Sequence, residues 1–282
     1  MELLHIDETI IARFLPERKR DTHKGDYGKV LLLCGSRGYT GAAALAAMGA
    51  LRSGSGLVYL AVPECIYAIE AVKLTEAIVF PLPDENGALS RLAIPEIEKR
   101  LPAMDAVVIG PGLGQGPGAL AALKTVLEKA KCPVVVDADG INLLGKHMHL
   151  LRGRPYPTVL TPHDGEYARL GGDLTANRVE DTVKMAQALG CVLVRKGHGS
   201  LITDGERCYR NPTGNPGMAV GGSGDVLAGL IAAFLGQGIP PLPAAACGCW
   251  FHGAAGDRCA RELGQYGMLP TDMLEVLPRL LK

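Results

Sequence analysis

The sequence lacks the features that would direct a protein to a membrane, to nucleic acid or out of the cell. Its longest apolar stretches, such as residues 41–51, are too short to cross a bilayer. No charge excess is present, because 29 Lys and Arg balance 29 Asp and Glu, which argues against nucleic acid or an anionic membrane as a partner. Polar residues interrupt the start of the chain, so no export signal is expected. We therefore expect a cytoplasmic protein.

A cysteine motif for zinc or redox chemistry is also missing. The eight cysteines are scattered, and the closest pair, Cys247 and Cys249, lacks the two-residue spacer that such motifs use. We expect reduced and mostly buried thiols, in agreement with a reducing cytoplasm. His147 and His149 have no carboxylate or cysteine at ligand spacing, so they are expected at the surface.

The chain has the material for one large domain, with 282 residues and 48% hydrophobic content. We find no repeat, low-complexity tract or linker, so residues 1–282 are expected to form a single domain. Short apolar runs without strict alternation, typical of strands covered on both faces, alternate with helical stretches. The predicted strands are 30–34, 57–62, 106–109, 134–137, 158–160 and 191–194, and the predicted helices are 41–53, 119–130, 178–189, 224–235 and 243–263. The pattern indicates an α/β fold with a central, mostly parallel sheet.

One late segment breaks the parallel pattern. Residues 201–203, the pair Asp204-Gly205 and residues 207–210 predict a β-hairpin. We therefore expect an antiparallel edge near the end of the sheet.

The strongest local pattern is a glycine-rich stretch that leads into an apolar helix. Residues 215–225, Asn-Pro-Gly-Met-Ala-Val-Gly-Gly-Ser-Gly-Asp, directly precede the apolar run 226–235. Glycines let backbone amides approach an anion, and a helix N-terminus adds unpaired donors and a partial positive charge. A carboxylate at Asp225 would repel a phosphate there, unless it accepts a proton from an attacking hydroxyl. Asp225 is therefore a candidate base, and Gly221, Gly222 and Gly224 are the glycines that would let backbone amides approach a phosphate.

An ordinary interpretation of this stretch also stays open. Asp225 can be a simple helix-start acid, and the glycines can form a tight turn. The stretch is not a Walker A loop, because no Gly-Lys-Ser/Thr follows, and it is not a dinucleotide fingerprint at an early strand.

A second candidate loop follows the predicted strand 191–194. Open α/β sheets place their ligands at the carboxyl ends of their strands, so Lys196 is placed to reach a nucleotide phosphate. Gly197 and Gly199 would let the loop lie against a ligand. The alternative is a solvated turn whose lysine has no role, and His198 is expected at the surface.

Acidic side chains follow two other predicted strands at the same sheet edge. Glu166 comes after residues 158–160, and its spacing from His163 lets both face one pocket. Asp137 and Asp139 come at the end of residues 134–137. Mg²⁺ favours carboxylates beside phosphates and keeps much of its water, so each of the three acids is a candidate ligand. Each can instead cap a helix.

Together these segments resemble the NAD(P)H-hydrate dehydratases of the ribokinase-like superfamily, which repair hydrated nicotinamide cofactors. The resemblance covers almost the whole chain, and the motifs occur in the family's order. They are His23-Lys-Gly25, Gly35-Ser36, Gly41-Ala42, Gly110-Pro-Gly112, Asp137-Ala-Asp139, Leu160-Thr-Pro-His163, Gly165-Glu166, Lys196-Gly197, residues 211–217 and residues 221–225. The resemblance implies a ribokinase-like three-layer sandwich with helices on both faces of the sheet.

The resemblance also implies which residues bind the two substrates. The implied contacts of the hydrate are Ala42, Gly112, His163 and Asp225, and those of ADP or ATP are Lys196, Gly197, His198, Gly199, Ser200 and Gly224. It further implies a homotetramer. Some relatives carry an N-terminal epimerase domain, and the residues before His23 are too few for it, so we expect the epimerase on a separate chain.

The implied reaction is the dehydration of the S form of NADH or NADPH hydrate, with Mg²⁺ as cofactor and ADP or ATP consumed. Hydroxide is a poor leaving group, so the ring hydroxyl would first be phosphorylated while Asp225 removes its proton. The amides of Gly222, Ser223 and Gly224 would stabilise the charge of the transferring phosphoryl group. Phosphate would then leave, which makes the enzyme a carbon–oxygen lyase.

Two other functions stay open. A vitamin or sugar kinase of the same superfamily would release a stable phosphorylated product, although the Pro162-His163 and Gly110-Pro-Gly112 segments match the dehydratases better. A non-catalytic adenine-nucleotide sensor would gain nothing from Asp225 beside a phosphate. The sequence leaves open the choice between ADP and ATP and between the two hydrates.

Overall fold

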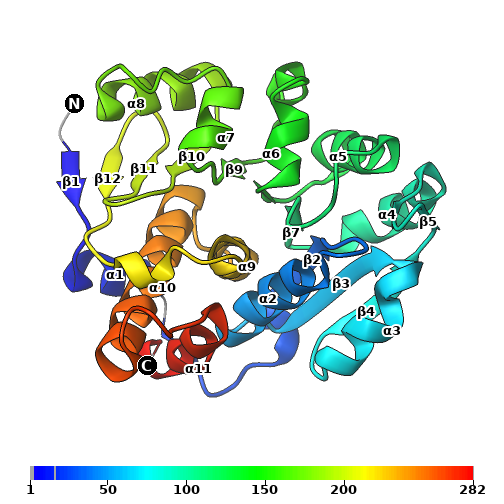
Figure 1. Cartoon of the computed structure of the whole chain (residues 1–282), viewed down its shortest axis with the longest axis horizontal. Helices are drawn as coiled ribbons and strands as arrows, with labels where there is room; N and C mark the ends of the chain where they lie inside the picture. The colour runs from blue at the N-terminus through cyan, green and yellow to red at the C-terminus, as the bar shows by residue number, and fades with distance from the viewer. Residues whose placement is uncertain (1–2, 16, 282) are drawn as a thin grey trace.

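Ten strands form one central sheet in the computed structural model, which describes residues 3–15 and 17–281. Their order across the sheet is β1-β12-β11-β10-β9-β8-β7-β2-β3-β4 (Figure 1). Their bounds are β1 (Leu3–His5), β2 (Lys29–Leu33), β3 (Leu57–Pro63), β4 (Ile78–Leu82), β7 (Ala106–Ile109), β8 (Val134–Val136), β9 (Thr158–Leu160), β10 (Val192–Arg195), β11 (Leu201–Thr203) and β12 (Cys208–Arg210). A small separate hairpin consists of β5 (Asp84–Glu85) and β6 (Ala88–Leu89).

Most of the sheet is parallel, as predicted. The strands from β4 to β10 in this order pair in parallel, and β11 is antiparallel to both of its neighbours, so the predicted hairpin is confirmed. The edge itself is different from the expectation, because β1 adds to β12 in parallel outside the hairpin. The partner of β1 comes from a distant part of the chain, so the sequence around residues 3–5 gives no sign of this pairing.

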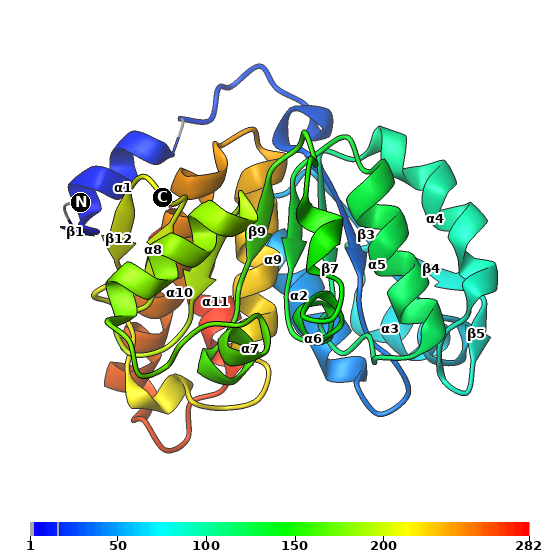
Figure 2. The ribbon, with the colours of Figure 1, turned by 90° about the horizontal axis from the view of Figure 1, so that it is seen from above.

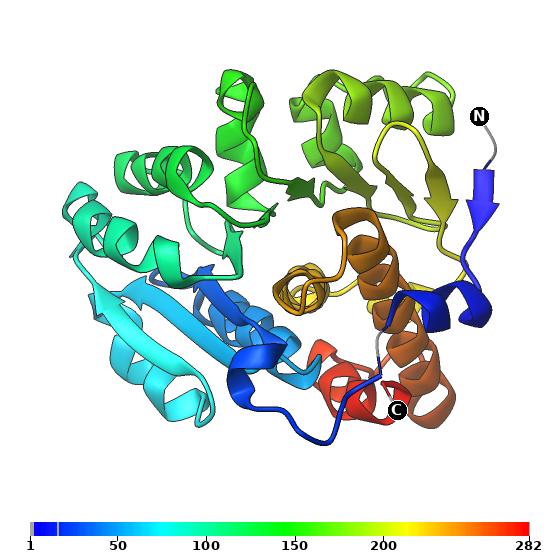
Figure 3. The ribbon, with the colours of Figure 1, turned by 180° about the vertical axis from the view of Figure 1, so that it is seen from behind.

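Helices cover both faces of the sheet. One face carries α4 (Ile94–Arg100), α5 (Pro117–Lys129), α6 (Asp139–Leu144), α7 (Asp164–Arg169) and α8 (Arg178–Leu189), which lie in front of the sheet in Figure 2. The other carries α1 (Glu8–Phe14), α2 (Thr40–Arg52), α3 (Glu64–Lys73), α9 (Ser223–Gly236), α10 (Pro241–Leu263) and α11 (Pro270–Leu280). The N-terminal helix α1 packs on α10, late in the chain (Figure 3). No helix among the described residues is both long and apolar enough to span a bilayer.

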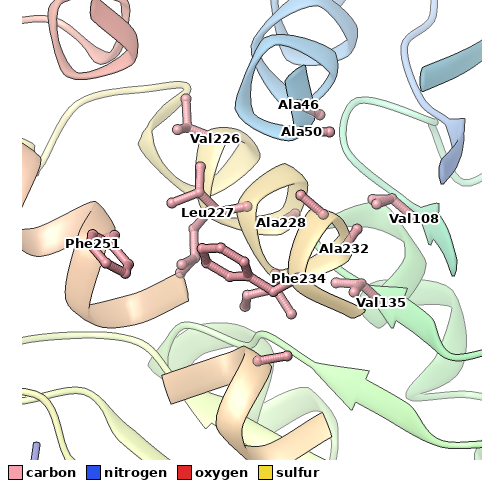
Figure 4. Close-up of a cluster of buried hydrophobic side chains, with 14 of the residues drawn as sticks. Ala46, Ala50, Val108, Val135, Val226, Leu227, Ala228, Ala232, Phe234 and Phe251 are labelled. Carbon is pink, nitrogen blue, oxygen red and sulfur yellow. The ribbon is translucent and has the colours of Figure 1, made fainter. Parts of the chain in front are cut away.

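Helix α9 lies at the centre of the core and is held by direct backbone contact with α2. A Cβ atom on Gly229 would lie 2.1 Å from the Ala46 carbonyl oxygen, and one on Gly49 would lie 2.5 Å from that of Val226. The other sides of α9 pack Ala232 against the sheet and Phe234 near Phe251 (Figure 4). Each large apolar side chain buried in this way contributes about 1.5–3 kcal/mol. The packing fixes where the first turn of α9 lies.

The prediction that most cysteines are buried is confirmed. All eight cysteines are free, and seven are buried, with Cys65 exposed. His149 is exposed and His147 is half-buried.

Candidate active site

A cavity of about 1060 Å³ lies at the carboxyl edge of the sheet. The loops that follow β8, β9, β10 and β12 line it, together with the first turn of α9. Most of the residues singled out in the sequence meet here. These are Asp137, His163, Glu166, Lys196, Gly197, His198, Gly199, Ser200, Ser223, Gly224 and Asp225.

The first turn of α9 faces this cavity with unpaired backbone donors. Gly222 precedes the helix with φ at +98°, a value that favours glycine, and no side chain caps the helix start. A Cβ atom on Gly224 would lie 3.3 Å from Lys196 Nζ. An ammonium group and a helix N-terminus therefore lie side by side, and both attract an anion.

Lys196 is held by two carboxylates. Its Nζ atom donates a hydrogen bond to Asp137 Oδ1 at 2.8 Å and lies 3.8 Å from Glu166 Oε2. Burial alone would lower the pKa of Lys196, but the charges of Asp137 and Glu166 raise it above its ordinary value. The lysine therefore stays charged in the cavity, and its pairing with two carboxylates favours a role in the site over the alternative of an idle side chain.

Asp225 has the properties of a base near neutral pH. Burial, and after it the negative charge of Asp137, raise the pKa of Asp225 to about 7, against the opposing charge of Lys196. A carboxylate with this pKa gains and loses a proton in the working range of most enzymes. The charges of Asp225 and Asp137 also contribute, after burial, to a raised pKa of Cys34, just beyond β2. Asp225 therefore acts electrostatically on both the cavity and the loop after β2.

His163 and Glu166 form a capping box at the start of α7. The His163 Nδ1 atom accepts a hydrogen bond from the Gly165 amide at 3.0 Å, and Glu166 Oε2 accepts one from the His163 amide at 2.9 Å. The capping alternative is therefore correct for Glu166. The same carboxylate is 6% exposed, and burial raises its pKa against the opposing charge of Lys196. Glu166 thus caps a helix and contributes charge to the cavity.

Asp137 and Asp139 are turned to different surroundings. The Gly140 amide donates to the Asp137 carbonyl at 2.9 Å, and the intervening Ala138 has a φ of +48°, a conformation that side chains rarely adopt. Past this turn, Asp139 accepts hydrogen bonds from the Gly114 amide at 2.8 Å and from Gln115 Nε2 at 3.0 Å. Asp139 is absent from the cavity lining, while Asp137 forms part of it.

The acids of the cavity fit a magnesium site of the kind that also uses phosphates. Within residues 3–15 and 17–281, no group of three or more His, Cys, Asp or Glu residues is arranged to hold a metal without other ligands. Mg²⁺ commonly takes one or two carboxylates and completes its shell with water and phosphate oxygens. Asp137 and Glu166, both beside Lys196, satisfy that requirement, and the magnesium assignment stays a prediction.

Ala42 and Gly112 lie beside each other, outside the cavity lining. A Cβ atom on Gly112, whose φ is +60°, would lie 3.0 Å from that of Ala42. A hydrogen bond from Ser36 Oγ to the Gly112 carbonyl at 2.7 Å joins the loop after β2 to the loop after β7. The predicted hydrate contacts therefore fall into two groups, with His163 and Asp225 in the cavity.

A buried histidine, His252, also contacts the first turn of α9. His252 on α10 hydrogen-bonds through Nε2 to the Ser223 carbonyl at 2.8 Å and lies 3.3 Å from Ser223 Oγ. Burial lowers the pKa of His252 to about 4, so the ring is neutral at pH 7 and Nε2 donates to the carbonyl. A lone histidine in an apolar helical run carries no signal of such a contact.

Helix α10 also fixes the segment that leads into the glycine-rich stretch. Asp257 accepts hydrogen bonds from the Gly214 amide at 2.9 Å and from Asn215 Nδ2 at 3.0 Å, and Asn211 Nδ2 donates to the Cys249 carbonyl at 3.1 Å. Gly253 lets Thr213 approach the helix, since a Cβ atom there would lie 2.2 Å from Thr213 Oγ1. Residues 211–216 therefore form a wall of the cavity. In the sequence, the motif at residues 211–217 was the signal that pointed to this segment.

The chain is similar over nearly its whole length to proteins of one family. A family model described as NAD(P)H-hydrate dehydratase matches residues 30–279. The bifunctional NAD(P)H-hydrate repair enzyme Nnr of Moorella thermoacetica is 47% identical over 275 residues, which are 95% of this chain and 52% of that protein. The chain thus spans about half the length of the curated relatives it matches.

Solved structures agree. The ADP/ATP-dependent NAD(P)H-hydrate dehydratase from Bacillus subtilis, co-crystallized with ATP/Mg²⁺, has a TM-score of 0.87 and 33% identity, covering 99% of this chain and 98% of that one. A ribokinase-like superfamily protein from Enterococcus faecalis V583 has a TM-score of 0.88 and 28% identity, covering 99% and 95%. The ribokinase-like α/β fold is confirmed. The chain belongs to the NAD(P)H-hydrate dehydratase family.

Proposed function

We propose that this chain catalyses the dehydration of the S form of hydrated NADH or NADPH, with ADP or ATP as the phosphoryl donor. The observation that carries the proposal is the position of Asp225, in the first turn of α9 beside Lys196, with a pKa of about 7. Family membership supports the choice of substrates. Because the relatives named Nnr are bifunctional and this chain spans about half of them, the proposal concerns dehydration alone.

The nucleotide phosphates bind at the start of α9. The amides of Gly222, Ser223 and Gly224 and the ammonium group of Lys196 supply positive charge to the transferring phosphoryl group. Residues 197–200 contact the rest of the nucleotide along the cavity wall. The B. subtilis relative, which was co-crystallized with ATP/Mg²⁺, supports a nucleotide in this fold.

Asp225 starts the reaction as the base. It takes the proton of the hydrate's ring hydroxyl while the hydroxyl oxygen forms a bond to the terminal phosphorus. The bond from that phosphorus to the remaining nucleotide breaks, so the nucleotide leaves one phosphate shorter. The ring nitrogen's lone pair then expels phosphate by breaking the carbon–oxygen bond, and loss of a proton from the adjacent ring carbon restores the reduced nicotinamide.

Asp137 and Glu166 would hold a magnesium ion through carboxylate oxygens and water, in contact with the nucleotide phosphates. The ion would neutralise charge on the transferring phosphoryl oxygens. Lys196 keeps the two carboxylates close together before the nucleotide arrives. Asp139 is the weakest candidate of the three, because backbone and side-chain donors already occupy its oxygens.

The test is to incubate the purified protein with Mg²⁺ and hydrated NADH, with ADP or ATP in parallel, and to follow reduced-nicotinamide absorbance and free phosphate. Equal recovery of both establishes the dehydratase and identifies the donor. Nucleotide consumption without recovery of absorbance would instead indicate a small-molecule kinase. Nucleotide binding without any turnover would indicate a sensor.

The stereochemical part has its own measurement. With a mixture of the two hydrate epimers, excess protein should recover only the fraction that is the S form, and an added epimerase should carry the recovery to completion. Complete recovery without epimerase, at a rate above that of spontaneous epimerisation, would contradict the S assignment.

The assembly and location follow from the same proposal. We place the enzyme in the cytoplasm as a homotetramer. The eight free thiols support a reducing compartment. Light scattering after size-exclusion chromatography measures the assembly directly, and a monomer would contradict the tetramer.

A further inference from the structure

Arg178, at the start of α8, donates hydrogen bonds to carbonyl oxygens of the loop that follows β10. Its Nη1 atom donates to the His198 carbonyl at 2.9 Å and to the Gly199 carbonyl at 3.3 Å. Its Nη2 atom donates at 3.4 Å to each of the carbonyls of Arg195 and Lys196. The carbonyl between them, on Gly197, accepts from Ser200 Oγ at 2.9 Å. All five carbonyls from residue 195 to residue 199 thus accept hydrogen bonds from side chains, four of them from one guanidinium group.

Two successive amides of the same loop are left free. Within residues 3–15 and 17–281, the His198 and Gly199 amides donate to no atom, although both residues line the cavity. Two glycines with positive φ, +143° at Gly197 and +60° at Gly199, produce this backbone. Successive free amides in such a turn form a small concave site for an acceptor or an anion.

The loop is shaped around the arginine. A Cβ atom on Gly197 would lie 3.0 Å from Arg178 Nη2, so the glycine leaves room for the guanidinium group. The arginine is fixed in turn, because the Asn177 side chain caps α8 by accepting from the amides of Val179 and Glu180 at 3.0 and 3.2 Å. A side chain anchored on a helix start therefore holds the loop.

We propose that Arg178 is a positioning residue for nucleotide binding: by holding the loop carbonyls, it presents the His198 and Gly199 amides and the Lys196 side chain to the nucleotide. This inference rests on the proposed function, since it takes an adenine nucleotide as the ligand of the loop. Lys196 is affected because its own carbonyl and that of Arg195 are among those held. A shift of about 1 Å in such a group lowers binding or rate by up to about 100-fold.

Arg154 offers a matched control. It is also half-buried, and its guanidinium donates to the Ala130 carbonyl at 3.2 Å and to the Cys132 carbonyl at 2.6 Å. Burial lowers the pKa of both arginines. The residues whose carbonyls Arg154 holds do not line the cavity, unlike Lys196, His198 and Gly199, so a loss of carbonyl hydrogen bonds there tests the structural effect alone.

The experiment measures ADP and ATP binding by calorimetry, and steady-state kinetics, for wild type, Arg178→Ala, Arg178→Lys and Arg154→Ala. We expect the nucleotide Kd and KM of Arg178→Ala to rise about 10- to 100-fold, while the hydrate KM changes less than twofold. Arg178→Lys should recover part of the loss, because an ammonium group can reach fewer carbonyls than the guanidinium fork. Arg154→Ala should lose thermal stability and keep wild-type nucleotide affinity.

Unchanged nucleotide affinity in a folded Arg178→Lys or Arg178→Ala protein would overturn the inference, and so would an equal rise in the hydrate KM. If Arg178→Ala does not fold, Arg178→Lys decides alone by the same split between the two KM values. Failure of the proposed function is distinguishable, because nucleotide binding is measured without turnover. A wild type that binds ADP but leaves the hydrate unchanged would remove the dehydratase and leave the binding comparison intact.

Discussion

Two stretches of this chain have the sequence pattern His-X-Gly-acid and fold alike at opposite edges of the sheet. His23 and Asp26 belong to the 3₁₀ turn (Lys24–Tyr27) that precedes β2, whereas His163 and Glu166 start α7 after β9. In both, the histidine Nδ1 accepts from a glycine amide, at 3.1 and 3.0 Å, and the acid accepts from the histidine amide, at 2.8 and 2.9 Å.

Their surroundings differ. Asp26 is 47% exposed, and its carboxylate lies 3.3 Å from the ring of His23. Glu166 is 6% exposed and lies 3.8 Å from Lys196, which belongs to the loop after β10. Parallel strands bring the residues that follow β8, β9 and β10 to one edge, whereas the residues that precede β2 lie at the other. The local pattern thus predicts a helix cap. Whether the cap precedes or follows a strand determines the edge of the sheet at which it lies, and so whether it becomes part of the site.

Asp225 is a third helix-start acid and differs from both. Asp26 and Glu166 each accept a hydrogen bond from a backbone amide through one carboxylate oxygen, whereas no side chain caps α9. The Asp225 carboxylate is therefore free for proton transfer, and burial raises its pKa to about 7.

The largest effect is expected from Asp225→Asn, with Asp26→Asn as its counterpart at the other edge. Removal of a general base lowers the rate by about 10²- to 10⁴-fold, so we expect a loss in kcat of about 10³-fold with nucleotide affinity retained. Asp26→Asn should keep wild-type kinetics. Hydrate turnover with saturating nucleotide is the measurement, and near-normal kcat in Asp225→Asn would rule out the base.

The pH profile sharpens the same assignment. A base works in its ionised form, so kcat/KM of the wild type should rise tenfold per pH unit below about pH 7 and level off above it. The measurement is kcat/KM for the hydrate between pH 5 and pH 9 under limiting substrate. A profile that is flat down to pH 5 would show that no group with the pKa of Asp225 controls the reaction.

Stability should change in the opposite direction to activity. The folded-state pKa of Asp225 is raised above the unfolded value, so the wild type loses stability as the pH rises from about 4 to about 7. Asp225→Asn avoids this loss and should be more stable above pH 7 by up to about 4 kcal/mol, with the difference vanishing below about pH 4. Asp26→Asn should show no such gain. Urea denaturation at pH 4.5 and pH 8 gives both values, and a variant less stable at pH 8 would contradict the cause assigned to the pKa.

Glu166→Gln separates the two roles of that side chain. Glutamine keeps an oxygen for the His163 amide, so the cap persists, but the charge beside Lys196 is removed. We expect a 10- to 100-fold lower kcat/KM and a higher magnesium requirement, since an amide is a poorer ligand for Mg²⁺ than a carboxylate. Asp26→Asn is again the matched change without kinetic effect. Equal magnesium dependence in wild type and Glu166→Gln would assign the carboxylate to capping alone.

Most of the central fold could be predicted from the sequence, because buried parallel strands and long helices carry strong patterns. Every predicted strand and helix is present with bounds within two residues. The elements that were not predicted include β4, α3 and α11, which have ordinary lengths, and β1, which forms by pairing with β12 more than 200 residues away. No turn or adjoining strand accompanies residues 3–5, so no local signal could have revealed β1.

Candidate site residues could be predicted where they follow a strand or a glycine-rich turn. They could not be predicted where a contact depends on how distant helices pack. The candidates Asp225, Lys196 and Glu166 come together because each begins the segment after a strand or a glycine-rich turn. The contacts of Arg178 and His252 depend on the packing of α8 and α10, which the sequence does not encode locally. The same limit explains Asp139, whose two-residue spacing from Asp137 could not reveal the turn at Ala138 that parts them.

The smallest effect expected is that of His163→Ser against His23→Ser. Serine is a good N-cap residue, so each variant should keep its helix start and lose no more than about 0.5 kcal/mol of stability. The His163 ring lines the cavity and is an expected hydrate contact, so His163→Ser alone should raise the hydrate KM, by about three- to tenfold, a loss typical of one substrate contact. Michaelis curves for both variants, with thermal melts as the control, give the answer. If both variants match wild type in KM while folding normally, His163 is a cap of the same kind as His23, and the hydrate contact must be sought on the Ala42 and Gly112 side of Asp225.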